Sequence, residues 1–349
     1  MRFFLGGYSS DLDICWLDPT DGSLEIVSKV TTPENASFVK YVPELSCAYA
    51  TVEAGYRTKE PGKIAAYRVD QSGMLTAIGS ASSCGTGPCH VDVDPDRRLL
   101  AAANYGGENF ALIRIRDDGT LGDLVACVRH RGSSVNHRRQ AEPHPHATYF
   151  SPDRAFLFVC DLGIDNLMRY RVDELIAGTG DDAGSVAAEL APGSGPRHLT
   201  FSPDGSLVYL VNELSNDIVV YRYSASDGAL EELQKVATLP PRFDGESTAA
   251  EIEIHPNGRY LYASNRGHDS IAVFSRSETD GTLEMIGTFS TTGEGPRHFQ
   301  LAPSGEWMLV ANQASDHVVS FRVDPDTGMG TWSGKSVHVP APACTEFWR

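Results

Sequence analysis

Histidine, arginine and glutamate residues recur at fixed distances from a series of prolines along this 349-residue chain. The prolines stand 47 to 57 residues apart, at Pro43, Pro95, Pro152, Pro203, Pro256 and Pro303. Ionisable residues lie six or five positions before these prolines or ten positions after them: His90, His146, Arg197, His198, Glu251, Arg297, His298, Glu53, Glu213 and Arg266. Imidazoles transfer protons near neutral pH, guanidinium groups bind anions and carboxylates act as bases. The spacing therefore predicts one site of acid–base chemistry, assembled from distant segments.

Each proline marks a turn within a repeated unit of about fifty residues. In the clearest copies, 195–213 and 295–313, a Gly-Pro-Arg-His start leads through the proline turn to a second apolar segment that ends at an Asn. A third β-rich segment follows in every unit: 64–69, 110–115, 167–172, 218–223, 271–275 and 318–323. An Asp-Gly or similar turn then usually introduces a fourth strand. One unit carries 173–185 instead, which we predict to be a surface insertion with a helical turn.

Four short strands per unit are typical of the blades of a β-propeller. A partial copy at 3–24 lacks its first strand, and the segment 343–348 at the other end could supply it. We therefore expect an all-β fold: a single seven-bladed propeller domain over residues 1–349, with four-stranded blades and one blade shared between the termini. A parallel β/α fold would need long helical segments between its strands, and almost none occur.

The first strand of each propeller blade lines the central channel, so the recurring ionisable residues should meet at one rim. Adjacent strand residues point to opposite sides, so only one residue of each Arg-His pair can face the channel. Three histidines recur in one register and could either brace blades or contact a ligand: His90, His198 and His298. Four residues stand at positions where the other units carry different residue types, and they are therefore better functional candidates: His146, Glu213, Glu251 and Arg266. Polar residues nine positions after the prolines are expected to cap turns: Asn104, Asp161, Asn212, Asn265 and Asn312.

The composition limits the partners and the compartment. Asp and Glu number 46 against 29 Lys and Arg, a net charge of −17, which argues against duplex nucleic acid or an anionic membrane as partner. No apolar run approaches the roughly 18 residues of a membrane span, and the apolar start is short for a secretory signal. The seven cysteines are scattered without a Cys-x-x-Cys pair, so we expect most of them to be free buried thiols and the location to be cytoplasmic.

Two further features leave alternatives open. Glu and Asn groups around the pore could hold Ca²⁺ or Mg²⁺, but the rim arginines would repel a cation, so we predict no metal and no cofactor. The segment 129–142 is rich in polar residues: Arg131, His137, Arg138, Arg139, Gln140 and Glu142. It either folds over the channel mouth and adds a basic contact or forms a solvated surface loop.

Five segments carry a resemblance to a known family: Pro-His-Pro-His-Ala (143–147), Gly-Pro-Arg-His (195–198 and 295–298), Val-Asn-Glu (211–213) and Ser-Asn-Arg-Gly-His-Asp-Ser-Ile (264–271). The chain resembles the seven-bladed lactonase family, which includes bacterial propeller-type 6-phosphogluconolactonases and fungal carboxy-cis,cis-muconate cyclases. The resemblance implies lactone chemistry at the channel mouth. It also implies the site residues, by motif: His146, Arg197, Glu213 and Arg266.

Our first hypothesis is hydrolysis of 6-phospho-D-glucono-1,5-lactone, a small anionic substrate. Glu213, or alternatively His146, would activate the water, and Arg197 would stabilise the oxyanion. Arg266, together with Arg297 or His198, would hold the phosphate. The substrate-binding residues are then Arg266, Arg297, His198, His298 and Glu251.

Two alternatives remain. On the same fold, the arginines could hold the carboxylates of a muconate-type dicarboxylate while Glu213 or His146 moves a proton during lactonisation or ring opening. The second alternative is a propeller that binds other proteins and catalyses no reaction, because a fold does not by itself determine function. No Gly-x-Ser-x-Gly elbow is present, which disfavours a covalent serine mechanism.

Overall fold

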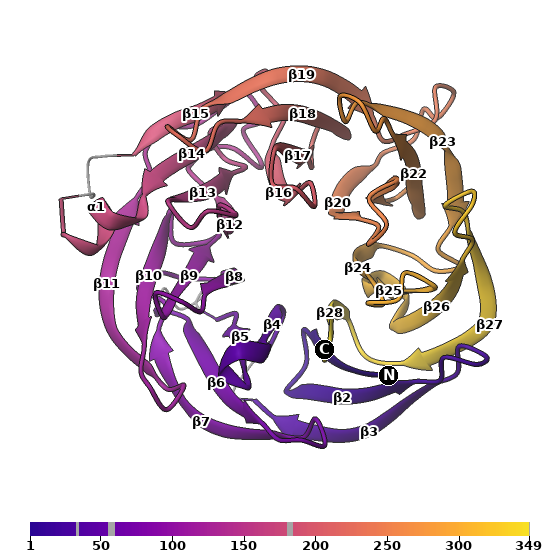
Figure 1. Cartoon of the computed structure of the whole chain (residues 1–349), viewed down its shortest axis with the longest axis horizontal. Coiled ribbons are helices and arrows are strands. Elements are labelled where there is room, and N and C mark those ends of the chain that lie inside the picture. Colours follow the sequence, from indigo (N-terminus) through magenta and orange to yellow (C-terminus); the bar gives the residue numbers. More distant parts are fainter. Residues whose placement is uncertain (33–34, 55–59, 180–183, 349) are drawn as a thin grey trace.

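The computed structural model describes residues 1–32, 35–54, 60–179 and 184–348. Its strands form seven four-stranded antiparallel sheets arranged in a ring around one axis (Figure 1). The seven-bladed propeller predicted from the repeat is therefore confirmed. Among the described residues, no helix is long and apolar enough to span a bilayer.

Blade 1 combines the two ends of the chain. It consists of β28 (Pro342–Phe347), β1 (Arg2–Gly7), β2 (Asp11–Leu17) and β3 (Leu24–Thr31). β28 pairs antiparallel with β1, with Leu5 opposite Thr345, so the C-terminal strand is the innermost strand of a blade begun by the N-terminus. The predicted closure of the ring is confirmed.

The other blades follow one another along the chain. Blade 2 is β4 (Val39–Val42), β5 (Cys47–Val52), β6 (Lys63–Val69) and β7 (Leu75–Ser82), and blade 3 is β8 (Pro88–Asp94), β9 (Leu99–Asn104), β10 (Asn109–Ile115) and β11 (Leu121–Arg129). Blade 4 is β12 (Pro145–Phe150), β13 (Phe156–Asp161), β14 (Asn166–Arg171) and β15 (Ser185–Glu189). Blade 5 is β16 (Pro196–Phe201), β17 (Leu207–Asn212), β18 (Asp217–Tyr223) and β19 (Leu230–Ala237). Blade 6 is β20 (Thr248–Ile254), β21 (Tyr260–Arg266), β22 (Ser270–Arg276) and β23 (Leu283–Ser290), and blade 7 is β24 (Pro296–Leu301), β25 (Trp307–Asn312), β26 (His317–Val323) and β27 (Gly330–His338).

Short helical segments interrupt this pattern. The helix α1 (Val172–Ile176) opens the insertion predicted between the third and fourth strands of blade 4, and residues 180–183 lie outside the described part of the chain. Two 3₁₀ turns, Pro43–Leu45 and Gln313–Ser315, connect β4 to β5 and β25 to β26.

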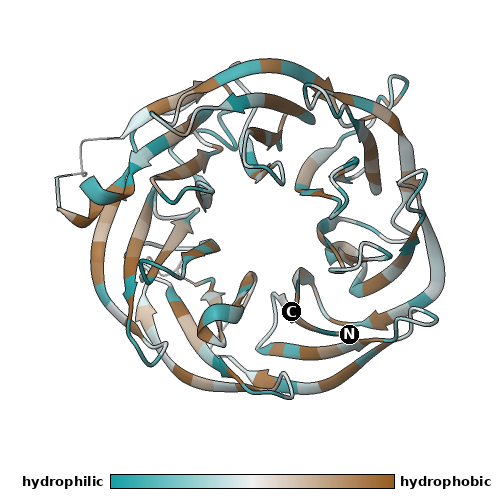
Figure 2. Cartoon of the chain, in the orientation of Figure 1, coloured by the Kyte–Doolittle hydropathy of each residue, from teal (hydrophilic) through white to brown (hydrophobic). Residues whose placement is uncertain are grey.

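The hydrophobic core lies between neighbouring blades. Tyr49 and Ile64 of blade 2, for example, pack on Val91, Leu100 and Ala111 of blade 3. Second strands such as β9, β17 and β25 are buried along their whole length. Outer strands such as β3 alternate between partly buried and exposed residues, because one of their faces meets water. Their ribbons carry both hydrophobic and hydrophilic segments (Figure 2). Burial between blades makes the ring rigid enough to hold side chains at its axis.

Repeated hydrogen bonds also tie each blade to the next. Three buried tyrosine hydroxyls donate to carbonyls of turn glycines in the following blade: Tyr49 to Gly119 (3.0 Å), Tyr209 to Gly281 (2.9 Å) and Tyr262 to Gly328 (2.9 Å). Gly281 has φ +73°, and a Cβ there would lie 2.0 Å from a methyl group of Leu207. The turn glycines predicted from Asp-Gly pairs are therefore required by conformation and by blade packing.

The polar residues at the ends of the second strands have two roles. Asp161 and Asn212 make bonds within their own blades that agree with the predicted capping: Asp161 accepts from the amides of His144 and Gly163, and Asn212 donates to Asp217. Asp161 also bonds His130, which follows the last strand of blade 3. The side-chain amides of three others donate to carbonyls of the preceding blade: Asn104 to Ser83, Asn265 to Thr238 and Asn312 to Thr291. Asn265 also bonds Ser270 across its own turn, so the capping prediction is wrong only for Asn104 and Asn312. All five side chains are buried.

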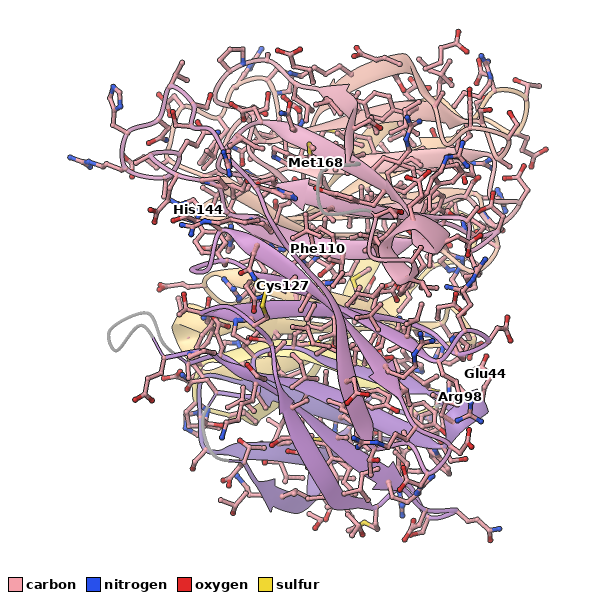
Figure 3. All side chains as sticks on the ribbon, turned by 90° about the vertical axis from the view of Figure 1, so that its left-hand side faces the viewer. Glu44, Arg98, Phe110, Cys127, His144 and Met168 are labelled. Atoms are coloured by element: carbon pink, nitrogen blue, oxygen red, sulfur yellow. A yellow bond between two sulfur atoms is a disulfide. The ribbon has the colours of Figure 1, made fainter. Side chains whose placement is uncertain are left out.

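One pair of cysteines is bonded, although most are free as expected. Cys84, which follows β7, and Cys127, in β11, form a disulfide between blades 2 and 3, visible beside the label of Cys127 in Figure 3. The two residues are 43 positions apart, but blade packing brings their Cα atoms to 6.4 Å. Sequence spacing alone does not reveal such a pair. The remaining cysteines are free and buried, as predicted: Cys15, Cys47, Cys89, Cys160 and Cys344.

Candidate active site

A pocket of about 380 Å³ opens at one end of the ring, and all seven blades contribute to it. Its lining consists of Tyr8, Glu53, Cys89, Tyr105, Arg139, His146, Glu213, Arg266 and Arg297. Most of these residues lie at the start of a first strand or just beyond the end of a second strand, as the rim prediction requires. Figure 3 shows His144, which stacks on Tyr105, near this face, and Glu44 and Arg98 near the opposite one.

Glu213 is the centre of the charged network. Its side chain is 2% exposed, and three guanidinium groups surround it. Arg139 Nη2 lies 2.5 Å from Oε1, while Arg197 Nε and Arg266 Nη2 lie 3.1 and 2.9 Å from Oε2. Burial opposes ionisation of the carboxyl, but the three arginines outweigh it and hold the pKa of Glu213 well below its usual range. Both oxygens are thus occupied, so Glu213 is better suited to orienting arginines than to accepting a proton.

His146 stands at the start of β12 in a different environment. Its side chain is buried, and its Nδ1 has no hydrogen-bond partner among the described residues. The ring lies edge-on to Tyr105, with centroids 5.5 Å apart. Burial and the charge of Arg197 lower the pKa of His146 well below its usual range. The imidazole is therefore neutral at neutral pH, so one of its ring nitrogens carries a lone pair that can accept a proton.

Arg297 is the cation of the pocket that has no acidic partner. Its guanidinium lies over the ring of Tyr8, 5.4 Å from the ring centroid. Within the described ranges it makes no ion pair or hydrogen bond. Burial opposes its charge, but Tyr8, Glu53 and Glu213 raise the pKa of Arg297, so it stays protonated. Arg297 can therefore bind an anion from outside the protein.

Glu53 is a second buried carboxylate of the lining. The Tyr8 hydroxyl donates a hydrogen bond of 3.2 Å to Glu53 Oε1. Glu53 Oε2 is buried and has no hydrogen-bond partner among the described residues. A buried acceptor without a donor is costly. A hydroxyl group of a bound molecule would satisfy it.

The segment 129–142 folds over the pocket mouth, which decides between the two alternatives left open by the sequence. Arg139 reaches both Glu213 and the hydroxyl of Tyr105, at 3.1 Å from the latter. Gln140 is fully buried and donates to the Leu162 carbonyl and to Asp165 Oδ1. These contacts fix the segment, while Arg131, His137 and Arg138 remain exposed.

Several predicted site residues lie behind the pocket. Arg197 is 2% exposed, donates to the Ala250 carbonyl and contacts Glu213 from outside the lining. The predicted substrate contacts His198, Glu251 and His298 are also absent from the lining and bond to one another. For His198, Glu251 and His298 the reason is strand alternation, because residues five positions before the proline point away from the pocket faced by His146 and Arg297, which stand six positions before it. Arg197 also stands six positions before its proline, but its guanidinium is held by Glu213 and the Ala250 carbonyl.

Those four residues therefore do not line the pocket. His146, Glu213, Arg266 and Arg297 do come together as predicted. No group of three His, Cys, Asp or Glu side chains in the described part of the chain could hold a metal ion.

The comparisons with known proteins agree with this geometry. Residues 2–347 match the family described as Lactonase, 7-bladed beta-propeller. The chain belongs to this lactonase family. A 6-phosphogluconolactonase of Bacillus subtilis (strain 168) is 35% identical to this lactonase-family chain over 287 residues, which cover 82% of the chain and 80% of that protein. A 6-phosphogluconolactonase of Formosa agariphila is 34% identical over 310 residues, 88% of this chain and 86% of that protein.

A solved structure extends the likeness. The periplasmic gluconolactonase of Pseudomonas aeruginosa superposes with a TM-score of 0.91 at 31% identity, covering 99% of this chain and 98% of that one. The resemblance inferred from sequence motifs is thereby confirmed at the level of the lactonase family and its fold.

Sequence reasoning gave no role to several pocket residues of this lactonase-family chain. Glu53, Cys89 and Tyr105 stand in the same rows as the predicted site residues, so their register could have identified them. Tyr8 belongs to the split blade, where the proline anchor is missing, and Arg139 belongs to a non-repeating segment. For those two residues the repeat contained no signal.

Proposed function

We propose that this protein hydrolyses a sugar lactone, with 6-phospho-D-glucono-1,5-lactone as the preferred substrate, to the open hydroxy acid. The observation that carries the proposal is a pocket lined by a neutral buried imidazole, His146, and by a guanidinium without an acidic partner, Arg297. The first can activate water, and the second can bind the substrate's phosphate. The names of the relatives support the same substrate class.

His146 acts as the base in this mechanism. It takes a proton from water as the water oxygen bonds to the lactone carbonyl carbon, which gives a tetrahedral oxyanion. The intermediate then breaks its bond to the ring oxygen, and the imidazolium of His146 donates the proton to that oxygen. The new carboxylic acid releases its own proton to solvent. Water is thus added across one ester bond, and His146 returns to its neutral form.

The arginines and Glu213 stabilise the charge that develops. Arg266 lines the pocket and, because Glu213 and the Ala249 carbonyl fix its Nη2, it presents an oriented cation to the oxyanion. Arg197 does not line the pocket and acts indirectly, because its guanidinium holds Glu213 in place. Orienting these groups before substrate binds avoids reorganisation during the reaction.

Glu53 favours a sugar over a dicarboxylate. Its buried Oε2 can accept a hydrogen bond from a sugar hydroxyl, whereas a substrate carboxylate placed beside it would be repelled. The pocket volume of about 380 Å³ suits a small ligand rather than a protein segment. These features weigh against both the muconate-type reaction and a purely structural propeller.

The test is turnover of freshly prepared lactones, followed by proton release and corrected for uncatalysed hydrolysis. We expect higher kcat/KM for 6-phosphoglucono-1,5-lactone than for glucono-1,5-lactone. Arg297→Gln should lower kcat/KM for the phosphorylated lactone by about 10- to 100-fold, with a much smaller effect on the other lactone. Arg98→Gln, on the opposite face, is the matched control. Rates at the uncatalysed level on every sugar lactone, or preferential turnover of a muconate, would overturn the proposal.

A further inference from the structure

A second group of ionisable side chains lies behind the pocket, on the innermost strands of blades 5, 6 and 7. His198 Nδ1 lies 3.0 Å from both carboxylate oxygens of Glu251, and His298 Nε2 lies 3.3 Å from Glu251 Oε2. His298 Nδ1 is 3.3 Å from the amide of Thr345, which can donate to it. All three ionisable side chains are buried, and none lines the pocket. The proposed hydrolysis assigns them no role.

His198, at one end of this group, lies next to His146, the proposed base. The rings of His146 and His198 meet edge to face with centroids 5.2 Å apart. His146 Nδ1 and His198 Nε2 are both buried and have no hydrogen-bond partner among the described residues. Since Nδ1 of His198 is bound to Glu251, its Nε2 is the nitrogen available on the other side of the ring. No hydrogen bond joins these two nitrogens in the structure, so His198 contacts His146 through the edge-to-face packing of the two rings.

We infer that Glu251 and His198 form a positioning dyad that orients His146 and compensates the positive charge it acquires during lactone hydrolysis. This inference rests on the proposed function, in which His146 takes a proton from water. Glu251 and His198 are positioning residues, because they act through His146 and do not touch the pocket. No covalent bond changes within the dyad.

The charges around His146 make such compensation necessary. The groups that act on His146 or on His198 are Arg197, Arg266, Arg297, Glu213, Glu251, His90, His298, Tyr105, Tyr149 and Cys89. The three arginines oppose formation of an imidazolium, and Glu213 is already neutralised by its own arginines. Glu251 is the acid on the buried side, and the dyad places it one imidazole away from His146.

The protonation tendencies of the dyad agree with this geometry. Burial raises the pKa of Glu251, while burial lowers the pKa of His198 and brings that of His298 to about 4. Because both imidazoles lie within 3.3 Å of Glu251, the protonation states of the three groups depend on one another. Such a set can change its charge when His146 changes its own.

The test compares Glu251→Gln and His198→Asn with the wild-type protein in two measurements. The first is the pH dependence of kcat/KM on the lactone. The second is the titration of His146 by NMR of ¹⁵N-labelled imidazole, which needs no turnover. We expect kcat to fall by about 10- to 100-fold with KM little changed, because only the proton-transfer step is affected. Without the negative charge of Glu251, the pKa of His146 should fall further, and the acidic limb of the profile should move to lower pH.

The buried pair His130 and Asp161 provides a matched control. His130 Nδ1 lies 2.6 Å from Asp161 Oδ2, and both side chains are as buried as the dyad, but neither lines the pocket. His130→Asn should lower the unfolding temperature without moving the acidic limb or the titration of His146. The inference is overturned if both dyad variants keep the wild-type limb and His146 titration. A wild-type protein without lactonase activity would overturn the proposed function instead, and the NMR titration would still test the dyad.

Discussion

Arg139 Nη2 lies 2.5 Å from Glu213 Oε1, although the two residues are 74 positions apart and only one of them belongs to the repeat. The same nitrogen donates to the hydroxyl of Tyr105. A non-repeating segment between β11 and β12 thereby completes a site that the seven blades leave open. The pocket depends on this contact as well as on the ring.

Removing the Arg139 side chain should weaken catalysis more than stability. In Arg139→Ala, Glu213 keeps two arginines, but Arg266 loses part of its orientation and the pocket loses one wall. Because Arg139 is 37% exposed, we expect only about a tenfold loss in kcat/KM and little change in unfolding temperature. Lactone kinetics and thermal unfolding check both. Arg138→Ala, at the exposed neighbouring position, should behave like wild type; equal losses in the two variants would contradict the contact's role.

Glu213→Gln should destabilise the protein in a pH-dependent manner. The substitution leaves three guanidinium groups without their buried counter-charge, which costs about 3–5 kcal/mol at pH 7. Since the folded pKa of Glu213 is depressed, its contribution is fully present above the ordinary Glu pKa of about 4.3 and is lost as the pH falls towards the folded value. Urea unfolding at several pH values should therefore show the difference from wild type shrinking below about pH 4. The exposed Glu284→Gln is the control, and a difference independent of pH would refute the assignment.

Glu53→Gln should change substrate choice. The variant keeps an oxygen acceptor but loses the negative charge that repels carboxylates, and it weakens the acceptor offered to a sugar hydroxyl. We expect kcat/KM for the sugar lactone to fall about tenfold and binding of a muconate-type dicarboxylate to strengthen. Competition assays with the dicarboxylate measure the second effect. Glu44→Gln, on the opposite face of the ring, should change neither quantity.

The disulfide between Cys84 and Cys127 should contribute measurably to stability. It closes a loop of 43 residues, which corresponds to about 2–4 kcal/mol in the chain-entropy picture. We expect five thiols to react in denaturant before reduction and all seven after it. The urea midpoint of Cys127→Ser should fall accordingly, whereas Cys15→Ser should leave the disulfide intact. Seven reactive thiols before reduction would contradict the bond between Cys84 and Cys127.

The repeat made the fold readable from sequence. Proline turns and Asp-Gly turns recur at nearly constant spacing because each blade needs the same turns between its strands. The number of residues between these turns therefore predicted the strand order and the blade shared by the two termini. The register also brought His146, Glu213, Arg266 and Arg297 to one rim, because residues at equivalent positions of equivalent blades lie at the same height around the axis.

The tertiary structure alone decided which of these residues share the pocket and what each one does. Strand alternation placed His198, Glu251 and His298 behind the lining, and three arginines meet at Glu213, which is why we propose His146 as the base. The contact of Arg139 and the Cys84–Cys127 bond join segments that share no period. Local sequence determines strands and turns through short-range preferences, whereas charge partners and burial depend on distances between blades.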